Sequence, residues 1–339
     1  MIHPGALGDV LLALPAIGFL RRKFPGHEFL LCANDEIGEL LKDCDVIDGW
    51  MSARGFSFGQ LFGGFVEAGS EIWDWLTRCD LAVAWVGDER GILEGVLRRY
   101  VQGKVTVCSP FSNLLSSVHQ SDRFLDALGE ASKEYSQPGP LLLPHRLLEL
   151  GRARFRETGI DPDREIILLH PGSGSPFKCA KPEILAEVID GLRQDGWSPA
   201  LVEGPADHIP VVEVVRRLEK RIIVLQDLNL GLLAGVLAVA DLFVGHDSGV
   251  SHLSASLGVE TIALFGPTMT ERWSPLGTHV TAVKADACRC PNWDAVRCCV
   301  ERPCLGISPR TLLDICRSRL ARRNPSKILT KRLVSEQVV

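Results

Sequence analysis

The segment Leu242–His252, which reads LFVGHDSGVSH, gathers an acid, hydroxyls and a histidine where a strand should turn into a helix. An apolar run comes first, and Ser248 stands where a helix N-cap is expected before the apolar pattern of Val250–Leu257. A strand that enters a helix in this way points free backbone N–H groups and the positive helix end at whatever lies above the sheet. The pattern therefore predicts a phosphate site at Asp247, Ser248 and Gly249, although an ordinary capped helix has the same local sequence.

A second loop of this kind, HPGSGS, follows the apolar run Ile166–Leu169. Its glycines let a backbone approach a ligand closely, and its hydroxyls and the lysine behind it supply donors and positive charge. Lys181 is an alternative to that lysine, because both stand shortly after the loop. The predicted phosphate or diphosphate ligands are Ser173, Gly174, Ser175 and Lys178.

The chain opens with a third such loop, HPGALGDV, in which Gly5 and Gly8 precede Asp9 at the start of an apolar helix. We expect this carboxylate to act as a general base, although a helix dipole favours an acid there in any protein and, while it keeps the carboxylate ionised, makes it a weaker base. Only Met1–His3 precede the loop, where a central strand is expected. We therefore predict that this strand is cut short and that the natural start lies further upstream.

The elements that must position these loops alternate along the chain. Strands are expected at 28–33, 46–51, 81–86 and 105–108 in the first half, with helices at 11–23, 36–42, 61–78, 93–100 and 122–128. A linker begins at 137–144, and a helix at 146–158 leads into the second half. Strands follow at 166–170, 199–203, 222–225, 242–244 and 261–265, and a last helix starts at 308. Such alternation predicts parallel α/β sheets, whose ligands bind at the carboxyl ends of the strands.

Length and composition agree with two domains. The chain has 339 residues, 46% of them hydrophobic and 23% charged, with a net charge of −5. This length fits two domains of about 150 residues, each with its own core. The negative charge argues against a nucleic-acid binder. The sequence displays neither a signal peptide nor an apolar run of the roughly 18–20 residues that a membrane span needs, which predicts a cytoplasmic protein.

The C-terminal segment between Arg310 and Arg332 is strongly basic and contains one acid, Asp314. We favour a solvated helix face as its explanation. The alternative is a surface for an anionic acceptor or for the inner membrane, with which the protein would then associate peripherally. The eight basic residues are Arg310, Arg317, Arg319, Arg322, Arg323, Lys327, Lys331 and Arg332.

Five of the eleven cysteines gather in the pattern C-x-C-x7-C-C-x4-C. Zinc sites prefer C-x2-C pairs, which this segment lacks. We favour reduced thiols or a labile local disulfide here, and metal binding and redox sensing are the alternatives. The five are Cys288, Cys290, Cys298, Cys299 and Cys304.

In this order along the chain, HPGALGDVLLALPAI, HPGSGSPFK, GPAD, DLFVGHDSGVSHLSASLG and LFGPT with RWSPLG resemble glycosyltransferase family 9. That family contains the bacterial heptosyltransferases, which move a heptose from ADP-heptose to the lipopolysaccharide inner core. The resemblance spans nearly the whole chain and implies an α/β fold of GT-B architecture, with two facing Rossmann-like, doubly wound domains and a cleft between them. We expect the acceptor-binding domain at 1–145 and the nucleotide-sugar-binding domain, with the cysteine-rich loop and the last helix, at 146–339.

The resemblance also implies roles for residues of the three loops. Asp9 matches the catalytic base, and Lys178 matches a lysine that contacts the diphosphate or donor sugar. Asp247 is expected to hydrogen-bond the donor sugar, Ser248 and Gly249 to bind the phosphates, and His252 to reach the diphosphate. The chain departs from the family at Ala180, where tryptophan is usual, and at His246, where asparagine is usual.

The sequence says less about which residues recognise the acceptor. His119 is a weaker candidate for it, and the loops 52–69 and 110–120 that should choose the acceptor carry no motif. The expected partners are a nucleotide-sugar donor, ADP-heptose, and a lipid-linked saccharide. No tightly bound cofactor is expected.

Two D-x-D pairs, at 43–45 and 161–163, resemble the metal motif of the other large glycosyltransferase architecture. Both stand at helix ends or linkers, so we interpret them as surface turns, and the sequence predicts neither a metal ligand nor a need for Mg²⁺. Four alternatives stay open: another nucleotide sugar, another acceptor, a GT-B-fold UDP-sugar 2-epimerase, and a non-catalytic nucleotide-sugar-binding protein.

Overall fold

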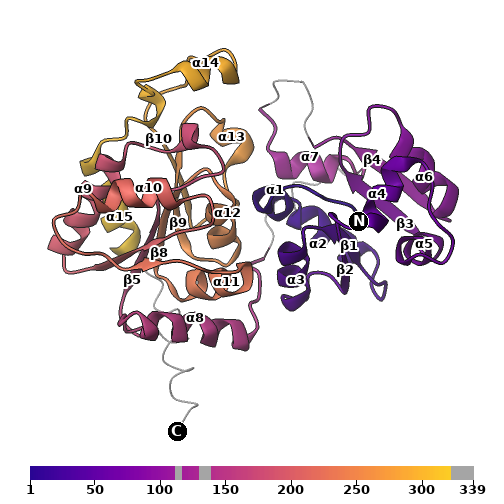
Figure 1. The fold of residues 1–339 in the computed structure, drawn as a ribbon, viewed down its shortest axis with the longest axis horizontal. Helices are drawn as coiled ribbons and strands as arrows, with labels where there is room; N and C mark the ends of the chain where they lie inside the picture. Colours follow the sequence, from indigo (N-terminus) through magenta and orange to yellow (C-terminus); the bar gives the residue numbers. More distant parts are fainter. Residues whose placement is uncertain (111–116, 130–138, 322–339) are drawn as a thin grey trace, which may run out of the picture. The chain divides into compact units, whose positions relative to one another are not determined.

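The structure, a computed structural model, describes residues 1–110, 117–129 and 139–321. These form two compact units (Figure 1). Unit 1 comprises Met1–Pro144 together with Glu271–Leu276, and unit 2 comprises His145–Thr270 and Gly277–Val339. The short segment 271–276 therefore packs with the first unit, whereas the sequence analysis placed it in the second domain.

Unit 1 is built on four strands in two parallel pairs. β1 (Leu30–Ala33) pairs with β2 (Gly49–Ser52), and β3 (Leu81–Trp85) pairs with β4 (Lys104–Cys108). Ile2 lies between the pairs and forms parallel bridges to Cys32 of β1 and Ala84 of β3. Its side chain is buried, so this one residue stands at the centre of the unit 1 sheet. The strand that the sequence analysis expected ahead of the first loop is thus represented by a bridge at Ile2.

The helices of unit 1 correct the sequence analysis at two places. The helix expected at 11–23 is divided at Ala13 into α1 (Leu7–Leu12) and α2 (Leu14–Lys23), because Pro15 has no N–H to continue the ladder. The helix expected at 61–78 is instead α4 (Phe56–Gly63) and α5 (Glu71–Thr77). Gly64 and Gly69, with φ of 83° and 80°, break the chain between them. The remaining helices are α3 (Asp35–Asp43), α6 (Ile92–Tyr100), α7 (Gln120–Asp126) and, with its last three residues in this unit, α13 (Thr270–Trp273).

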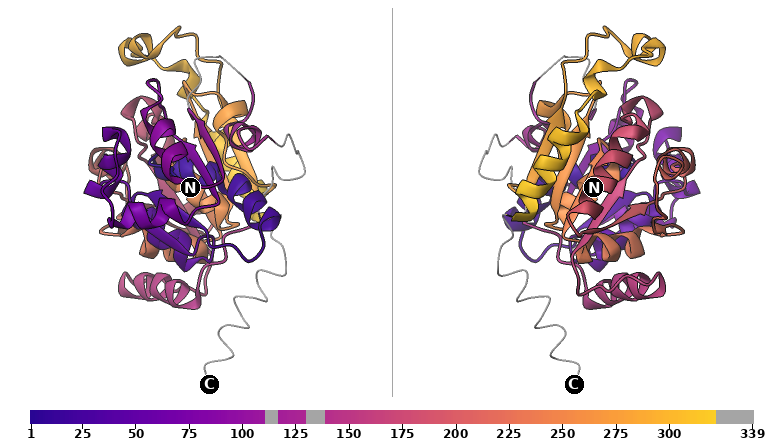
Figure 2. Two further views of the ribbon diagram at one scale, coloured as in Figure 1. Left: turned by 90° about the vertical axis from the view of Figure 1, so that its right-hand side faces the viewer. Right: turned by 90° about the vertical axis from the view of Figure 1, so that its left-hand side faces the viewer.

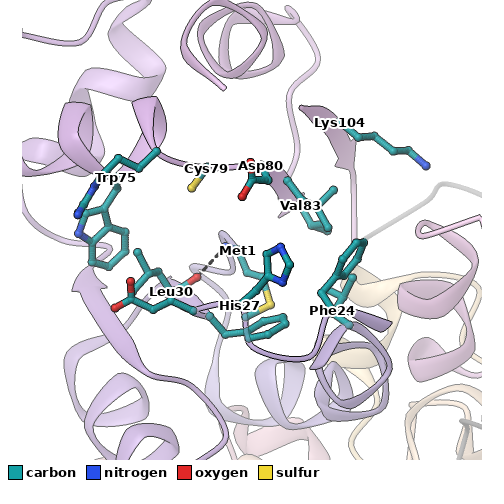
Figure 3. A pocket seen from close by; sticks show the side chains of 14 residues that line it. Met1, Phe24, His27, Leu30, Trp75, Cys79, Asp80, Val83 and Lys104 are labelled. Carbon is teal, nitrogen blue, oxygen red and sulfur yellow. Dashed lines mark hydrogen bonds between the residues drawn. The ribbon is translucent and has the colours of Figure 1, made fainter. Parts of the chain in front are cut away.

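A cavity of about 480 Å³ opens at the amino ends of the unit 1 strands (Figure 3). Leu30 and Lys104, which begin β1 and β4, line it together with Trp75. The Met1 ammonium donates a hydrogen bond to the Leu30 carbonyl oxygen at 2.7 Å within it. This is the opposite edge of the sheet from the loop that carries Asp9, so the cavity plays no part in the site described below.

Unit 2 is a parallel six-stranded sheet in the order β10-β9-β8-β5-β6-β7. Its strands are β5 (Ile166–His170), β6 (Ser198–Val202), β7 (Val224–Leu225), β8 (Leu242–His246), β9 (Glu260–Phe265) and β10 (Val280–Lys284). The sequence analysis did not predict β10, whose residues are only partly buried at the sheet edge and whose apolar pattern is correspondingly weak.

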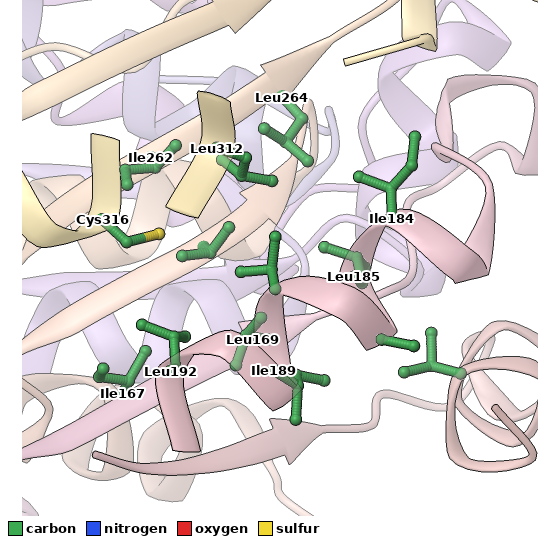
Figure 4. Close-up of a cluster of buried hydrophobic side chains, with 14 of the residues drawn as sticks. Ile167, Leu169, Ile184, Leu185, Ile189, Leu192, Ile262, Leu264, Leu312 and Cys316 are labelled. Atoms are coloured by element: carbon green, nitrogen blue, oxygen red, sulfur yellow. The ribbon is translucent and has the colours of Figure 1, made fainter. Parts of the chain in front are cut away.

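Helices cover both faces of this sheet. Alternate residues of the central strands, such as Leu169 and Val244, point to one face, where they pack on α9 (Pro182–Gln194), α10 (His208–Val215) and α15 (Pro309–Ala321) (Figures 2 and 4). α11 (Leu230–Val239), α12 (Gly249–Ser256) and α8 (His145–Glu157) form the other layer. α14 (Trp293–Cys298) and the short 3₁₀ helices at Pro176–Lys178 and Pro303–Leu305 lie in the connecting loops.

The contact between α8 and α11 requires two glycines. A Cβ placed on Gly235 would lie 2.1 Å from the carbonyl oxygen of Leu147, and one on Gly151 would lie 2.3 Å from the backbone of Gly235. The two helix backbones therefore touch directly, which no larger residue permits. This contact fixes the helix layer under β8, whose carboxyl end carries the site.

Candidate functional site

The unit 2 sheet has a topological switch point between β5 and β8. From β5 the chain adds β6 and β7 on one side, and β8, β9 and β10 extend the sheet on the other. The loops that leave two such neighbouring strands diverge, and ligands of parallel α/β sheets bind in the crevice between them. Two of the loops that the sequence predicts to bind phosphate are those that follow β5 and β8. The fold therefore brings these two loops together at the switch point.

Direct contacts join these loops. The Lys178 ammonium donates to an Asp247 carboxylate oxygen at 2.7 Å, and the Ser173 hydroxyl donates to the Asp247 carbonyl oxygen at 2.7 Å. The Asp247 side chain is 7% exposed and that of Lys178 is 23% exposed. The pair places one positive and one negative side chain, both partly desolvated and engaged with each other, at the switch point.

Lys178 and Lys181 differ in their surroundings. Lys178 closes the 3₁₀ turn after the loop and reaches Asp247. Lys181 instead precedes α9 and lines a cavity of about 490 Å³ beside the loop after β5, together with Ser173 and Ile209. Of the two lysines, Lys178 is the one that the structure brings to the other loop.

His246 holds the loop after β5 through hydrogen bonds to its backbone. It is completely buried, and its Nε2 accepts a hydrogen bond from the Ala180 N–H at 2.9 Å. Nε2 is therefore unprotonated, and Nδ1 carries the hydrogen toward the Gly172 carbonyl oxygen at 3.3 Å. Burial, followed by the charge of His170, lowers the pKa of His246 to about 4. The ring thus has a structural task as a neutral imidazole, and it does not reach the surface where a sugar would bind.

The start of α12 supplies backbone donors beside Asp247. Ser248 is the N-cap, and its hydroxyl accepts a hydrogen bond from the Ser251 N–H at 3.5 Å. Gly249 begins the helix, and His252 lies one turn further in, 5% exposed. The N–H groups of the first turn and the positive helix end favour an anion here.

The other two predicted loop residues have different surroundings. A Cβ built on Gly174 would meet open space, so the backbone at this point is accessible. The Ser175 hydroxyl caps the following 3₁₀ turn by accepting from the Phe177 N–H at 3.4 Å. Gly174 therefore offers an open backbone, whereas Ser175 has a local structural contact.

Asp207 is a site residue to which the sequence analysis gave no role, although it ends the quoted GPAD segment. Its carboxylate accepts from His170 Nε2 at 2.8 Å and from the Gly204 N–H at 3.0 Å. Burial raises the pKa of Asp207, but the hydrogen bond from His170, the charge of that ring and the hydrogen bond from Gly204 together outweigh it, so the pKa is lowered. A Cβ on Gly172 would lie 1.8 Å from this carboxylate. Asp207 therefore fixes the end of β5 and requires the glycine that opens the loop.

In unit 1, Asp9 lies in the first turn of α1, which also contains Gly8. The loop before it bends around His3, whose Nδ1 accepts from the Gly5 N–H at 3.3 Å. A Cβ on Gly5 would lie 2.7 Å from the His3 ring and 3.2 Å from Asp9 Cβ. Burial lowers the pKa of His3 to about 4. The glycine and a neutral, buried histidine thus hold the turn that presents Asp9.

Both ring nitrogens of His119 are occupied inside unit 1. Nδ1 accepts from the Ser121 N–H at 3.3 Å, so Nε2 carries the hydrogen that it donates to the Ser274 carbonyl oxygen at 2.9 Å. Burial lowers the pKa of His119. His119 caps α7 and ties it to the segment 271–276.

The remaining predictions concern cysteines, metals, membranes and the basic segment. All eleven cysteines are free thiols. Within residues 1–110, 117–129 and 139–321, neither a group of side chains able to hold a metal ion nor a helix long and apolar enough to span a membrane is found. Arg317 pairs with Asp195 and Arg319 with Glu260. The basic residues Arg322, Arg323, Lys327, Lys331 and Arg332 lie outside the described residues.

Comparison with known proteins gives one family match. The model of glycosyltransferase family 9 (heptosyltransferase) matches residues 119–301. Lipopolysaccharide heptosyltransferase 1 of Pseudomonas aeruginosa is 24% identical to the chain, over 98% of the chain and 96% of that protein. Lipopolysaccharide heptosyltransferase 3 of Escherichia coli is 32% identical over 113 residues, which are 32% of the chain and 33% of that protein. A putative glycosyltransferase of Haemophilus influenzae is 26% identical over 41% of the chain and 42% of its own length.

Solved structures share the fold. A family 9 glycosyltransferase from Veillonella parvula superposes with a TM-score of 0.79 at 19% identity, covering 95% of this chain and 96% of that one. ADP-heptose LPS heptosyltransferase II of Escherichia coli gives a TM-score of 0.69 at 17% identity, over 95% and 98% of the two chains. These structures confirm the predicted α/β fold of the GT-B class.

Proposed function

Because this chain belongs to glycosyltransferase family 9, we propose that it transfers a heptose from ADP-heptose to a saccharide of the lipopolysaccharide inner core. The chain is accordingly a glycosyltransferase, and the donor and the acceptor are the parts that we propose. The observation that carries the proposal is the junction of the two unit 2 loops, where Lys178 and Asp247 meet at the switch point.

The donor diphosphate is proposed to bind where Lys178, Ser248 and Gly249 meet. The ammonium and the N–H groups at the start of α12 would offset the charge that develops on the leaving diphosphate. When Lys178 turns to the diphosphate, Asp247 is released from its ion pair and its carboxylate can accept hydrogen bonds from sugar hydroxyls. Before the donor binds, the ion pair thus satisfies the charges of Lys178 and Asp247, and the donor replaces each partner with its own groups. His252, at 5% exposure, is proposed to complete the diphosphate site from within the helix.

Asp9 is proposed to take the proton of the acceptor hydroxyl as that oxygen attacks the anomeric carbon. The glycosidic bond to the diphosphate then breaks, and ADP leaves with the electron pair. A base within reach of the attacking hydroxyl contributes about 10²–10⁴-fold to such a step. Positive charge from Lys178 and the helix end serves the leaving group, and we propose that no Mg²⁺ is needed at the diphosphate.

The acceptor is proposed to be lipid-linked, so the enzyme would work in the cytoplasm at the surface of the inner membrane. The basic C-terminal segment, of which Arg310, Arg317 and Arg319 are described, is the part of the chain that would make such contact peripheral. Because Arg317 and Arg319 are engaged in ion pairs, a solvated helix face remains the preferred interpretation of these two residues.

Calorimetric titration of the full chain with ADP, UDP and GDP, each with and without Mg²⁺, tests the donor. Selective ADP binding that does not depend on the metal is expected, and ADP-heptose should then be consumed only when an inner-core saccharide is present. Preference for UDP or GDP would overturn the donor while leaving the family intact. ADP binding without any transfer would instead favour a non-catalytic nucleotide-sugar-binding protein.

A further inference from the structure

The loop after β5 is contacted by a side chain from a distant part of unit 2, the cysteine-rich loop 285–308 between β10 and α15. The Arg302 guanidinium donates from Nη1 to the Pro176 carbonyl oxygen at 2.9 Å. Arg302 Cζ also lies 5.2 Å from the centre of the Phe177 ring, within the range of a cation–π contact. Pro176, Phe177 and Lys178 form one 3₁₀ turn. Arg302 therefore contacts both of the residues that lead into Lys178.

The backbone of Arg302 is strained in the position from which this side chain extends. Its φ of 46° and ψ of 59° lie in the left-handed region, which residues with a Cβ rarely adopt. Arg302 Nε is also buried, and no group in the described part of the chain forms a hydrogen bond with it. Both features cost free energy, and strained residues concentrate at sites where a function uses their geometry. The conformation of Arg302 thus indicates a task beyond the packing of its own loop.

The segment that follows Arg302 is fixed to the sheet. Leu305, in the 3₁₀ helix Pro303–Leu305, is 2% exposed, and a Cβ on Gly266 would lie 2.6 Å from Leu305 Cγ. Gly266 directly follows β9, so this helix packs at the carboxyl end of that strand. Ile307, which is 3% exposed, continues into the core of unit 2. Arg302 therefore extends from a well-packed base and restrains the turn that it contacts.

The Phe177 side chain also faces the cysteine-rich loop. It lines a void of about 60 Å³ together with Arg302 and four of the cysteines, which act there as small, weakly polar packing partners. The loop thus surrounds the turn before Lys178 with a cation on one side and thiols on another. The four cysteines are Cys288, Cys290, Cys299 and Cys304.

Arg302 completes a set of three contacts that hold the loop after β5. Near the start of the loop, the Ser173 hydroxyl donates to the Asp247 carbonyl oxygen. Near its end, the Ala180 N–H donates to His246. Arg302 acts between these two points, at the turn that contains the lysine. Of the three contacts, it is therefore the one that bears most directly on the position of the lysine ammonium.

We propose that Arg302 is a positioning residue for Lys178, which holds the 3₁₀ turn so that the lysine ammonium stays where the donor diphosphate binds. The inference rests on the proposed function, because it takes the donor site from it. A turn that is correctly placed for only a fraction of the time lowers the apparent affinity for a ligand by that fraction. Loss of Arg302 should therefore weaken donor binding, although Arg302 itself does not touch the donor.

Calorimetric titration of the full chain with ADP is the first measurement. Arg302→Met removes the guanidinium and keeps the aliphatic stem, and Arg302→Lys keeps a cation that can still donate to Pro176. Arg297→Met, at a 62% exposed side chain of α14 in the same loop, is the matched control. Arg302→Met should bind ADP about 5- to 30-fold more weakly than the wild-type chain and the control, with Arg302→Lys between them. Unchanged ADP affinity in Arg302→Met would overturn the inference.

A double-mutant cycle with Lys178→Met shows whether Arg302 acts through the lysine. In the Lys178→Met background, Arg302→Met should change ADP affinity by less than about 2-fold, because no ammonium is left to position. A residue that only supports the fold would weaken ADP binding equally in both backgrounds. Equal losses in the two backgrounds would thus contradict a positioning role.

Amide hydrogen exchange of the nucleotide-free chain tests the same contact without the donor. The Lys178 N–H donates to the Ser175 carbonyl oxygen at 3.0 Å, so its exchange reports opening of the turn. This exchange should be about 5- to 30-fold faster in Arg302→Met and unchanged in Arg297→Met. Equal exchange in all three chains would overturn the inference, whether or not ADP binds.

The two measurements separate this inference from the proposed function. A wild-type chain that binds no ADP, together with faster exchange in Arg302→Met, would count against the donor alone and leave Arg302 as the residue that holds the turn. ADP binding by the wild-type chain, together with unchanged exchange and affinity in Arg302→Met, would count against the positioning role alone. If Arg302→Met does not fold, Arg302→Lys carries both comparisons.

Discussion

At the scale of single residues, Asp9 and Lys178 carry the opposite halves of the proposed reaction. Asp9→Asn keeps the size of the side chain and removes the base. We expect kcat to fall about 10²–10⁴-fold with the affinity for ADP unchanged, because Asp9 belongs to unit 1 and the donor loops belong to unit 2. Glu36→Gln, which neutralises an exposed acid in the first turn of α3, is the matched control. Equal activity of Asp9→Asn and the control would remove Asp9 from the mechanism.

Because Lys178 is proposed both to bind the donor and to neutralise Asp247, we expect a second substitution to restore the unfolding free energy without restoring ADP affinity. Lys178→Met should weaken ADP binding about 10- to 100-fold and cost about 1–3 kcal/mol of unfolding free energy, because the 7% exposed carboxylate loses its partner. Adding Asp247→Asn should restore stability and leave ADP binding weak. Lys181→Met is the control, and denaturant unfolding and calorimetry are the measurements. A larger loss of ADP affinity in Lys181→Met than in Lys178→Met would reverse the assignment of the two lysines.

At the scale of elements, the bridges of Ile2 join the two strand pairs of unit 1. Ile2→Ala should lower the unfolding free energy of the unit by about 2–5 kcal/mol, because the side chain is 6% exposed in the core between β1 and β3. Ile209→Ala removes the same atoms from a residue that is 75% exposed and should cost little. Urea unfolding measures both. Similar losses in the two variants would show that burial of the Ile2 side chain does not stabilise the centre of the unit 1 sheet.

At the scale of the whole molecule, two buried histidines, one in each unit, make stability depend on pH. His3 and His246 have a pKa of about 4 in the folded chain and 6.5 when exposed. Between these values the unfolded chain binds protons that the folded chain does not, so stability is complete above pH 6.5 and falls as the pH drops toward 4. Each contributes at most about 3 kcal/mol. Asp207, whose pKa is lowered from 3.8, acts only below this window.

Thermal unfolding between pH 4 and 7.5 checks this dependence. His246→Asn should flatten the fall of stability for unit 2, because asparagine does not titrate. His27→Asn, at an exposed position of unit 1, should leave the curve unchanged. An identical slope in wild type and His246→Asn would show that His246 is protonated in the folded chain.

The sequence by itself determined the alternation of strands and helices, the three loops and their residues. These follow from local patterns, since apolar runs, glycines and capping residues act over a few positions. Local patterns also misled in places: two glycines divided the helix expected at 61–78, and the weakly apolar β10 gave too little signal. Whether a glycine interrupts a helix, and whether a weakly apolar segment joins the edge of a sheet, depends on how the rest of the chain packs against it.

Only the tertiary structure decided which loops meet. Lys178 and Asp247 are 69 positions apart, and no local pattern specifies that β5 and β8 are neighbours at a switch point. The same holds for Asp207, which gains its role from His170, and for the segment 271–276, which packs on α7 within unit 1 although the chain on both sides of it belongs to unit 2. Contacts between distant positions form because strand order and burial place them together, and a sequence read along one dimension does not contain that order.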